Sequence, residues 1–144
     1  MRTLLVLARV SNLPTVWSNC LAAWLIAGGT SWARFGLVCL GASLLYTGGM
    51  FLNDAVDEDF DRRYRPERPI VASQISSRSV WVLSCLWLGA GLAALISLGK
   101  LPTLMAVVLL LTIVLYDVVH KRTRLAPVLM AACRFWLYLV AGSY

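Results

Sequence analysis

Long stretches without a charged side chain alternate along the chain with short segments in which charges are crowded. The three longest uncharged stretches cover residues 10–33, 35–53 and 79–99 and contain 24, 19 and 21 residues. Two further apolar stretches follow at 101–116 and at 125–144, and the last contains a single charge, Arg134. A helix needs about 20 apolar residues to cross a bilayer, so the pattern is typical of a multi-pass membrane protein.

Helices are the expected secondary structure because lipid offers no hydrogen-bond partners to an exposed backbone. The composition supports this class: 60% of the residues are hydrophobic and 14% are charged, whereas soluble domains carry about 25% charged residues. Too little polar sequence remains to cover so large an apolar core in water. We therefore predict an all-α fold, a polytopic transmembrane helix bundle of about five spans. The expected helices lie near 12–29, 34–54, 79–99, 102–117 and 125–142.

The basic residues are distributed unequally between the two sides of this topology. Ten of the thirteen fall on the side of the N-terminus, at Arg2 and Arg9, at Arg62, Arg63, Arg65, Arg68 and Arg78, and at Lys121, Arg122 and Arg124. The opposite loops hold only Arg34 and Lys100. The positive-inside rule places the crowded side in the cytoplasm. The net charge of +6 thus reflects membrane topology, and we expect a lipid bilayer as the partner and no nucleic acid.

The connection between the second and third expected helices holds most of the acidic residues. On a helix with 3.6 residues per turn, Asp54, Asp57 and Asp61 lie at roughly 0°, 300° and 340°, which is one narrow face. Three carboxylates on one face repel each other unless a cation lies among them. Oxygen ligands without cysteine or histidine suit a hard ion such as Mg²⁺. These aspartates are therefore candidate metal ligands.

Two arginines follow the aspartates at once. Arg65 and Arg68 can hold phosphate oxygens through bidentate hydrogen bonds, and carboxylate-bound metal ions beside them would form a site for a diphosphate. A solvated charged segment at the membrane surface is the alternative interpretation of the same residues.

The complete block resembles the first aspartate-rich motif of the UbiA prenyltransferase superfamily. The motif reads Asn-Asp-x-x-Asp-x-x-x-Asp and then Arg-Pro-x-Arg-Pro-Ile, and the matching positions are Asn53, Asp54, Asp57, Asp61, Arg65, Pro66, Arg68, Pro69 and Ile70. One departure is that residues 71–76 lack the glycine that often follows this block. Two other segments are similar to the family: residues 9–15, with Asn12, and residues 116–122, with Tyr116 and Lys121.

The resemblance implies a nine-helix fold and the Mg²⁺-dependent transfer of a prenyl group from a prenyl diphosphate to an aromatic or other lipophilic acceptor. It implies that Asp54, Asp57 and Asp61 are catalytic as metal ligands. The implied substrate-binding residues are Asn12, Asn53, Arg65, Arg68, Tyr116, Lys121 and Arg134. Arg134 has two interpretations, since an arginine in an apolar segment can contact a substrate or lie near the membrane interface.

Length is the main departure from the family, whose members are roughly twice as long and carry a second aspartate-rich motif in their second half. After Glu67 the only acidic residue here is Asp117. We therefore expect residues 1–144 to be the N-terminal half of such a membrane domain, truncated at its C-terminus and inactive unless the missing C-terminal half completes it. A non-catalytic membrane partner and a small membrane transporter are the alternative functions.

The topology generates the first prediction. Reporter domains inserted near Arg65 and near Lys100 should report opposite sides of the membrane, because one uncharged stretch separates the two loops and the basic residues crowd around the first. Reporter activity in each compartment measures this. The same sidedness at both sites would refute the topology.

Overall fold

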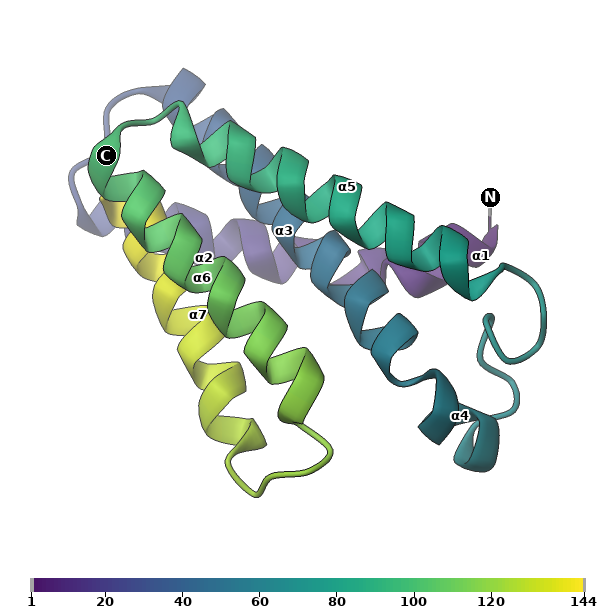
Figure 1. Cartoon of the computed structure of the whole chain (residues 1–144). Helices are drawn as coiled ribbons and strands as arrows, with labels where there is room; N and C mark the ends of the chain where they lie inside the picture. Colours follow the sequence, from purple (N-terminus) through teal and green to yellow (C-terminus); the bar gives the residue numbers. More distant parts are fainter. Residues whose placement is uncertain (1, 144) are drawn as a thin grey trace.

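The computed structural model describes residues 2–143, and its regular structure is entirely helical (Figure 1). In chain order the helices are α1 (Arg2–Leu7), the 3₁₀ turn η1 (Val10–Asn12), α2 (Leu13–Ile26), α3 (Trp32–Val56), α4 (Glu58–Tyr64), α5 (Ser77–Ile96), α6 (Lys100–Val119) and α7 (Ala126–Gly142).

The five long helices agree closely with the five expected from the sequence. Of these, α3, α5 and α6 are long and apolar enough to cross a membrane, whereas α7 has 17 residues and α2 has 14. At 1.5 Å per residue, α2 is about 21 Å long, which is shorter than the roughly 30 Å hydrocarbon layer. The class of multi-pass helical membrane protein is thus confirmed, while the number of five full spans stays a prediction.

Local signals in the sequence explain where several helices begin and end. Ser31 and Ser76 cap the first turns of α3 and α5 by accepting a hydrogen bond from the backbone N–H three residues later. Gly28 and Gly99, which adopt φ angles of 72° and 128°, lie in the connections that follow α2 and α5. Glycine reaches these angles without a steric penalty, so the chain can reverse direction there.

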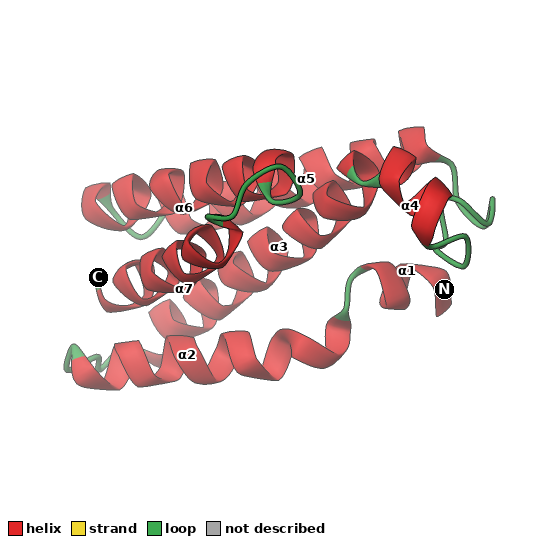
Figure 2. Cartoon of the chain, turned by 90° about the horizontal axis from the view of Figure 1, so that it is seen from below, coloured by secondary structure: helices red, strands yellow, loops and turns green. Residues whose placement is uncertain are grey.

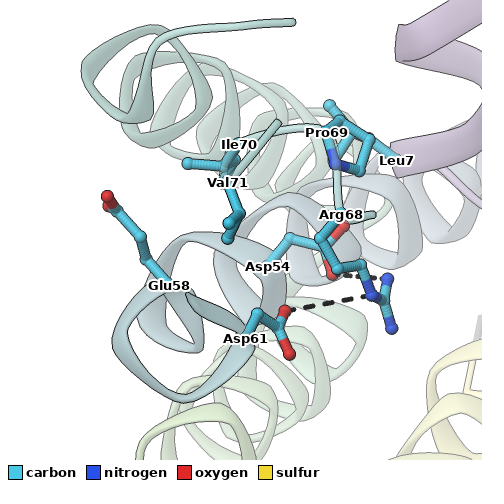
Figure 3. Close-up of a pocket in the computed structure, with 8 residues that line it drawn as sticks. All are labelled: Leu7, Asp54, Glu58, Asp61, Arg68, Pro69, Ile70 and Val71. Atoms are coloured by element: carbon cyan, nitrogen blue, oxygen red, sulfur yellow. Dashed lines mark hydrogen bonds and ion pairs between the residues drawn. The ribbon is translucent and has the colours of Figure 1, made fainter. Parts of the chain in front are cut away.

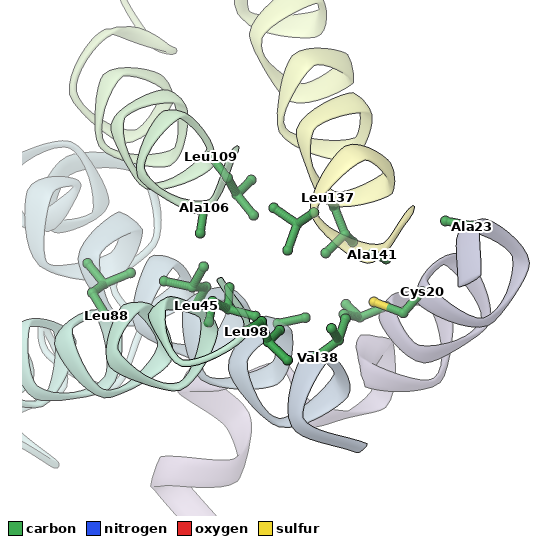
Figure 4. Close-up of a cluster of buried hydrophobic side chains, with 14 of the residues drawn as sticks. Cys20, Ala23, Val38, Leu45, Leu88, Leu98, Ala106, Leu109, Leu137 and Ala141 are labelled. Carbon is green, nitrogen blue, oxygen red and sulfur yellow. The ribbon is translucent and has the colours of Figure 1, made fainter. Parts of the chain in front are cut away.

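Helix α3 lies at the centre of the bundle, with α5 packed along it and α2, α6 and α7 against its remaining sides. The main apolar core forms where these helices meet, and it includes Val38, Leu45, Leu88, Ala106 and Leu137 (Figure 4). Many large apolar side chains face outward instead, such as Leu86 and Leu111, each 62% exposed. Outward apolar surface on long helices fits a lipid environment.

Small residues allow α3 and α5 to approach closely. A Cβ atom added at Gly48 would lie 2.8 Å from the backbone nitrogen of Leu88, and one at Gly91 would lie 2.9 Å from that of Leu45. The Ser84 hydroxyl donates a hydrogen bond to the Gly48 carbonyl across the same interface, at 3.0 Å. Close backbone contact is a major source of helix association in lipid, because the hydrophobic effect gives little preference for one apolar surface over another there.

The N-terminal helix α1 was not expected from the sequence. A short loop separates it from α2, and it lies at the same end of the molecule as α4 (Figure 2). Leu7 and Ala8 are buried in a second apolar cluster with Phe51, Ala55 and Val80. This cluster fixes the N-terminal segment beside the end of α3, where the aspartates lie.

The α3–α5 interface predicts a difference between two glycines on one helix. Gly91→Leu should destabilise the protein by at least about 2 kcal/mol, because the new side chain overlaps the α3 backbone. Gly89→Leu is the matched control, since no atom lies within 4 Å of a Cβ added there. Thermal unfolding in detergent measures both. Equal effects of the two substitutions would show that close α3–α5 contact does not stabilise the fold.

Candidate functional site

The aspartates lie at the junction between α3 and α4. The N–H of Asp57 bonds to the Asn53 carbonyl at 3.0 Å, and the N–H of Asp61 bonds to the Asp57 carbonyl at 2.8 Å. The four-residue helical register therefore continues through the break. Asp54, Asp57 and Asp61 are 4%, 7% and 2% exposed, whereas Asp59 is exposed. The expectation that three carboxylates share one face is confirmed.

Two arginines from distant segments meet at Asp54. The Arg68 Nη1 atom lies 3.2 Å from Asp54 Oδ1, and an Arg9 Nη2 atom lies 3.4 Å from the same oxygen. The Arg68 Nε atom is also 3.9 Å from Asp61 Oδ2, so this one guanidinium lies against two carboxylates (Figure 3). Arg68 thus joins the segment after α4 to the end of α3.

Asp57 is paired with the end of α6. The Lys121 ammonium lies 2.9 Å from Asp57 Oδ2, and the His120 Nε2 atom lies 3.4 Å from it. Lys121 is also 3.9 Å from Asp61 Oδ1 and 3.5 Å from the centre of the Phe60 ring, a cation–π contact. The basic segment at 121–124 therefore reaches the aspartates across the bundle, through Lys121.

A deeper pair lies beneath these contacts. The Asn53 amide donates to Asp117 Oδ1 at 3.2 Å, and Asp117 is 2% exposed on α6. The side-chain oxygen of Asn53, Oδ1, accepts a hydrogen bond from Arg9 Nη2 at 3.4 Å. Arg9, Asp117 and His120 were absent from the predicted site. All three lie in the two segments, 9–15 and 116–122, that resemble the family, but nothing in the sequence pattern links Asp117 to Asn53, which is 64 residues earlier.

The carboxylate oxygens of Asp54, Asp57 and Asp61 are ligands that suit a hard cation. They form one side of a metal site and not a complete one. Asp54 Oδ2 and Asp61 Oδ1 are buried and accept no hydrogen bond from any residue between 2 and 143. Within that range no three acidic, histidine or cysteine side chains converge closely enough to hold an ion by themselves. Mg²⁺ is commonly held by one or two carboxylates together with substrate phosphates and water, and these two oxygens, of which Asp61 Oδ1 also lies 3.9 Å from the Lys121 ammonium, fit that mode.

The space beside the aspartates is narrow. Leu7, Asp54, Asp61, Arg68 and Ile70 are among the residues that line a crevice that is too narrow to admit a water molecule (Figure 3). Arg68 and Lys121 lie next to the carboxylates on either side.

The remaining predicted residues are not all brought to the aspartates. Arg65 is exposed and lines a neighbouring hollow of ≈ 690 Å³, and Asn12 is exposed at the start of α2. Tyr116 is half-buried and stacks on His120 with the ring centres 5.0 Å apart. Arg134 is exposed on α7 and has no hydrogen bond or ion pair with residues 2–143. The roles of all the predicted site residues remain predictions.

The fold and the inward-facing carboxylates define a class, the multi-pass helical membrane proteins with an acidic site at one end of the bundle. The model of the UbiA prenyltransferase family matches residues 11–144. The chain belongs to the UbiA prenyltransferase family.

Its relatives carry several different functional names. The chain is 30% identical to a 4-hydroxybenzoate octaprenyltransferase of Cupriavidus metallidurans over 102 residues, which are 69% of this chain and 35% of that protein. It is 28% identical to a digeranylgeranylglyceryl phosphate synthase of Methanoculleus marisnigri over 139 residues, 96% of this chain and 50% of the relative. A protoheme IX farnesyltransferase of Geobacter sulfurreducens is 34% identical over 98 residues, 65% of this chain and 36% of that protein.

A solved structure described as that of a digeranylgeranylglyceryl phosphate synthase in membranes superposes with a TM-score of 0.90. The match covers 99% of this chain and 52% of the other, with 23% sequence identity, so it shows the fold alone. The chain therefore spans about half of this structure, and half or less of the length of the three relatives.

The double contact of Arg68 generates a stability prediction. Arg68→Gln should lower the free energy of unfolding by about 2 kcal/mol, because two buried carboxylates lose their nearest positive charge on this side. Arg65→Gln is the control, since Arg65 is exposed and makes no side-chain ion pair within residues 2–143. Thermal unfolding in detergent without divalent ions measures both. If Arg68→Gln lowers the stability no more than Arg65→Gln does, these ion pairs contribute little to the free energy of unfolding.

Proposed function

We propose that this chain forms the part of an intramembrane prenyltransferase that holds the donor diphosphate. The reaction is the Mg²⁺-dependent transfer of a prenyl group from a prenyl diphosphate to an aromatic or other lipophilic acceptor. The observation that carries the proposal is the set of three buried aspartates, Asp54, Asp57 and Asp61, surrounded by basic side chains at one end of an apolar helix bundle. Membership of the UbiA prenyltransferase family supports it.

The chemistry assigns complementary roles to the acidic and basic residues. Asp54, Asp57 and Asp61 would hold Mg²⁺, which would offset the negative charge that grows on the diphosphate as the allylic carbon–oxygen bond breaks. Arg68 and Lys121, which lie against these carboxylates, would donate hydrogen bonds to phosphate oxygens. The bonding electrons leave with the diphosphate, the acceptor supplies the electron pair for the new bond to the prenyl carbon, and the alkylated acceptor atom gives up its proton to the diphosphate or to water.

The membrane location suits such a donor. The diphosphate is held at the polar end of the bundle, while the apolar chain extends along the helices toward the lipid. We place the N-terminus and the aspartates on the cytoplasmic side, since ten of the thirteen basic residues lie in the segments on that side. In Figure 1, α4 and the α6–α7 connection lie at one end of the molecule, away from the α5–α6 connection.

These residues specify neither one particular acceptor nor a complete set of metal ligands. Two of the relatives are named for the groups 4-hydroxybenzoate and protoheme IX, and a third for its product, digeranylgeranylglyceryl phosphate. These compounds are chemically dissimilar, so we propose an aromatic or other lipophilic acceptor and no particular compound. The metal site is one-sided within this part of the protein. We propose that a second segment, corresponding to the C-terminal half of the relatives, supplies the remaining ligands.

A charge-removing substitution tests this function in the protein made from its complete coding sequence. Asp57→Asn should reduce prenyl transfer by roughly 100-fold, because it keeps the size of the side chain but removes a charge that holds the metal, worth several kcal/mol in the transition state. Turnover of a radiolabelled prenyl diphosphate, with matched protein amounts, measures the change.

Asp59→Asn is the control for this test. Asp59 is exposed and lies away from the inward face, so its substitution should change the rate by no more than a few-fold. Small and equal losses at Asp57 and Asp59 would mean that the aspartates form only a structural charge network. The protein would then be better described as a non-catalytic membrane partner or as a transporter.

A further inference from the structure

The side chain of Asn53 lies between a cation and a buried carboxyl group. Its Oδ1 atom accepts a hydrogen bond from Arg9 Nη2 at 3.4 Å, and its Nδ2 atom donates to Asp117 Oδ1 at 3.2 Å. Asn53 and Asp117 are 7% and 2% exposed. This contact joins α3 to α6 directly beneath the aspartates.

The chemistry of the two neighbours fixes the orientation of the amide. A guanidinium group can only donate hydrogen bonds, so the side-chain oxygen of Asn53, Oδ1, must face Arg9. The amide nitrogen then faces Asp117, which accepts its hydrogen. If the Asp117 carboxyl group were removed, Nδ2 would lose its acceptor, and the contact with Arg9 alone would hold the orientation and the position of the amide.

The backbone of Arg9 shows that this residue is held in place at some cost. Its φ and ψ angles are 45° and 47°, a left-handed conformation that is unfavourable for residues other than glycine. The Tyr46 hydroxyl lies 3.4 Å from the Arg9 carbonyl oxygen and donates to it. Strained residues of this kind persist where the surrounding structure determines them, and they are concentrated at functional sites.

We propose that Asp117 is a positioning residue, which acts through Asn53 to hold the Arg9 guanidinium beside Asp54 for contact with the donor diphosphate. Arg9 contacts both Asn53 Oδ1 and Asp54 Oδ1, each at 3.4 Å. With a metal ion on Asp54, Arg9 would keep the Asn53 oxygen as its partner, and its other N–H groups would be available to phosphate oxygens. The inference rests on the proposed function.

Asp117 lies in the last turn of α6, four residues before Lys121, which belongs to the turn that follows the helix. Lys121 contacts Asp57 at 2.9 Å. The Asn53–Asp117 hydrogen bond therefore joins α3 to the end of α6 close to the point at which Lys121 reaches the aspartates.

A double-mutant cycle tests the proposal on the protein made from its complete coding sequence. Calorimetry in detergent gives the affinity for farnesyl diphosphate with Mg²⁺, and thermal unfolding is measured in parallel. Asp117→Ala and Asn53→Ala should each weaken binding about tenfold, as expected for one lost hydrogen bond to a charged group. The double variant should also lose about tenfold, because both changes break the same connection. A loss of about 100-fold in the double variant would overturn the proposal.

Two conservative substitutions test the same hydrogen bond in case an alanine variant does not fold. Asp117→Asn should bind within about threefold of the wild type, since its amide oxygen still accepts from Asn53. Asn53→Asp should bind weakly because it places two carboxyl groups together. Combined with Asp117→Asn, it should recover binding, because the hydrogen bond is restored with the donor and acceptor exchanged. Failure of this recovery at unchanged thermal stability would overturn the positioning role.

The outcomes separate this inference from the proposed function. If the wild-type protein does not bind farnesyl diphosphate in the presence of Mg²⁺, the proposed function fails and the inference fails with it. If the wild type binds and Asp57→Asn abolishes turnover, but the Asp117 and Asn53 effects are additive, the function stands and the inference alone is wrong.

Discussion

Three carboxylates buried within about two helical turns must be balanced by positive charge, and the arrangement of this end of the protein follows from that requirement. Removal of a carboxylate from water is costly unless it is paired. The basic partners come from three separate segments, at Arg9, Arg68 and Lys121. Each ion pair fixes a different segment beside the end of α3. The polar site therefore connects three parts of the chain: the N-terminal segment, the segment that follows α4, and the end of α6.

The same charge balance explains how the site could function. Arg9, Arg68 and Lys121 lie against the three carboxylates, and the crevice beside Asp54, Asp61 and Arg68 is too narrow to admit a water molecule. In the function that we propose, a metal ion would take over the charge balance and leave the arginines and the lysine to bind an anion. Asp54 Oδ2 and Asp61 Oδ1 accept no hydrogen bond from residues 2–143, so these oxygens are the candidate ligands.

The apolar part of the bundle obeys a different rule. Lipid-facing and core-facing side chains are equally apolar, so periodic hydrophobicity does not distinguish them, and small residues decide which faces meet. Gly48 and Gly91 bring α3 and α5 into backbone contact. The close α3–α5 pair supports one side of the acidic site, because α3 carries Asp54 in its last turn and ends directly before Asp57.

The positions of the five long helices, the membrane class and the single face of aspartates could be predicted from the sequence alone, since each depends on local spacing: stretches without charge and the 3.6-residue period. Tertiary structure alone decided which cations reach those aspartates. Arg65 and Arg68 are equivalent candidates in the sequence, yet only Arg68 contacts them, because the chain bends after α4. Arg9 and Asp117 reach Asn53 from 44 and 64 residues away. Such contacts arise from helix packing, and no local pattern encodes them.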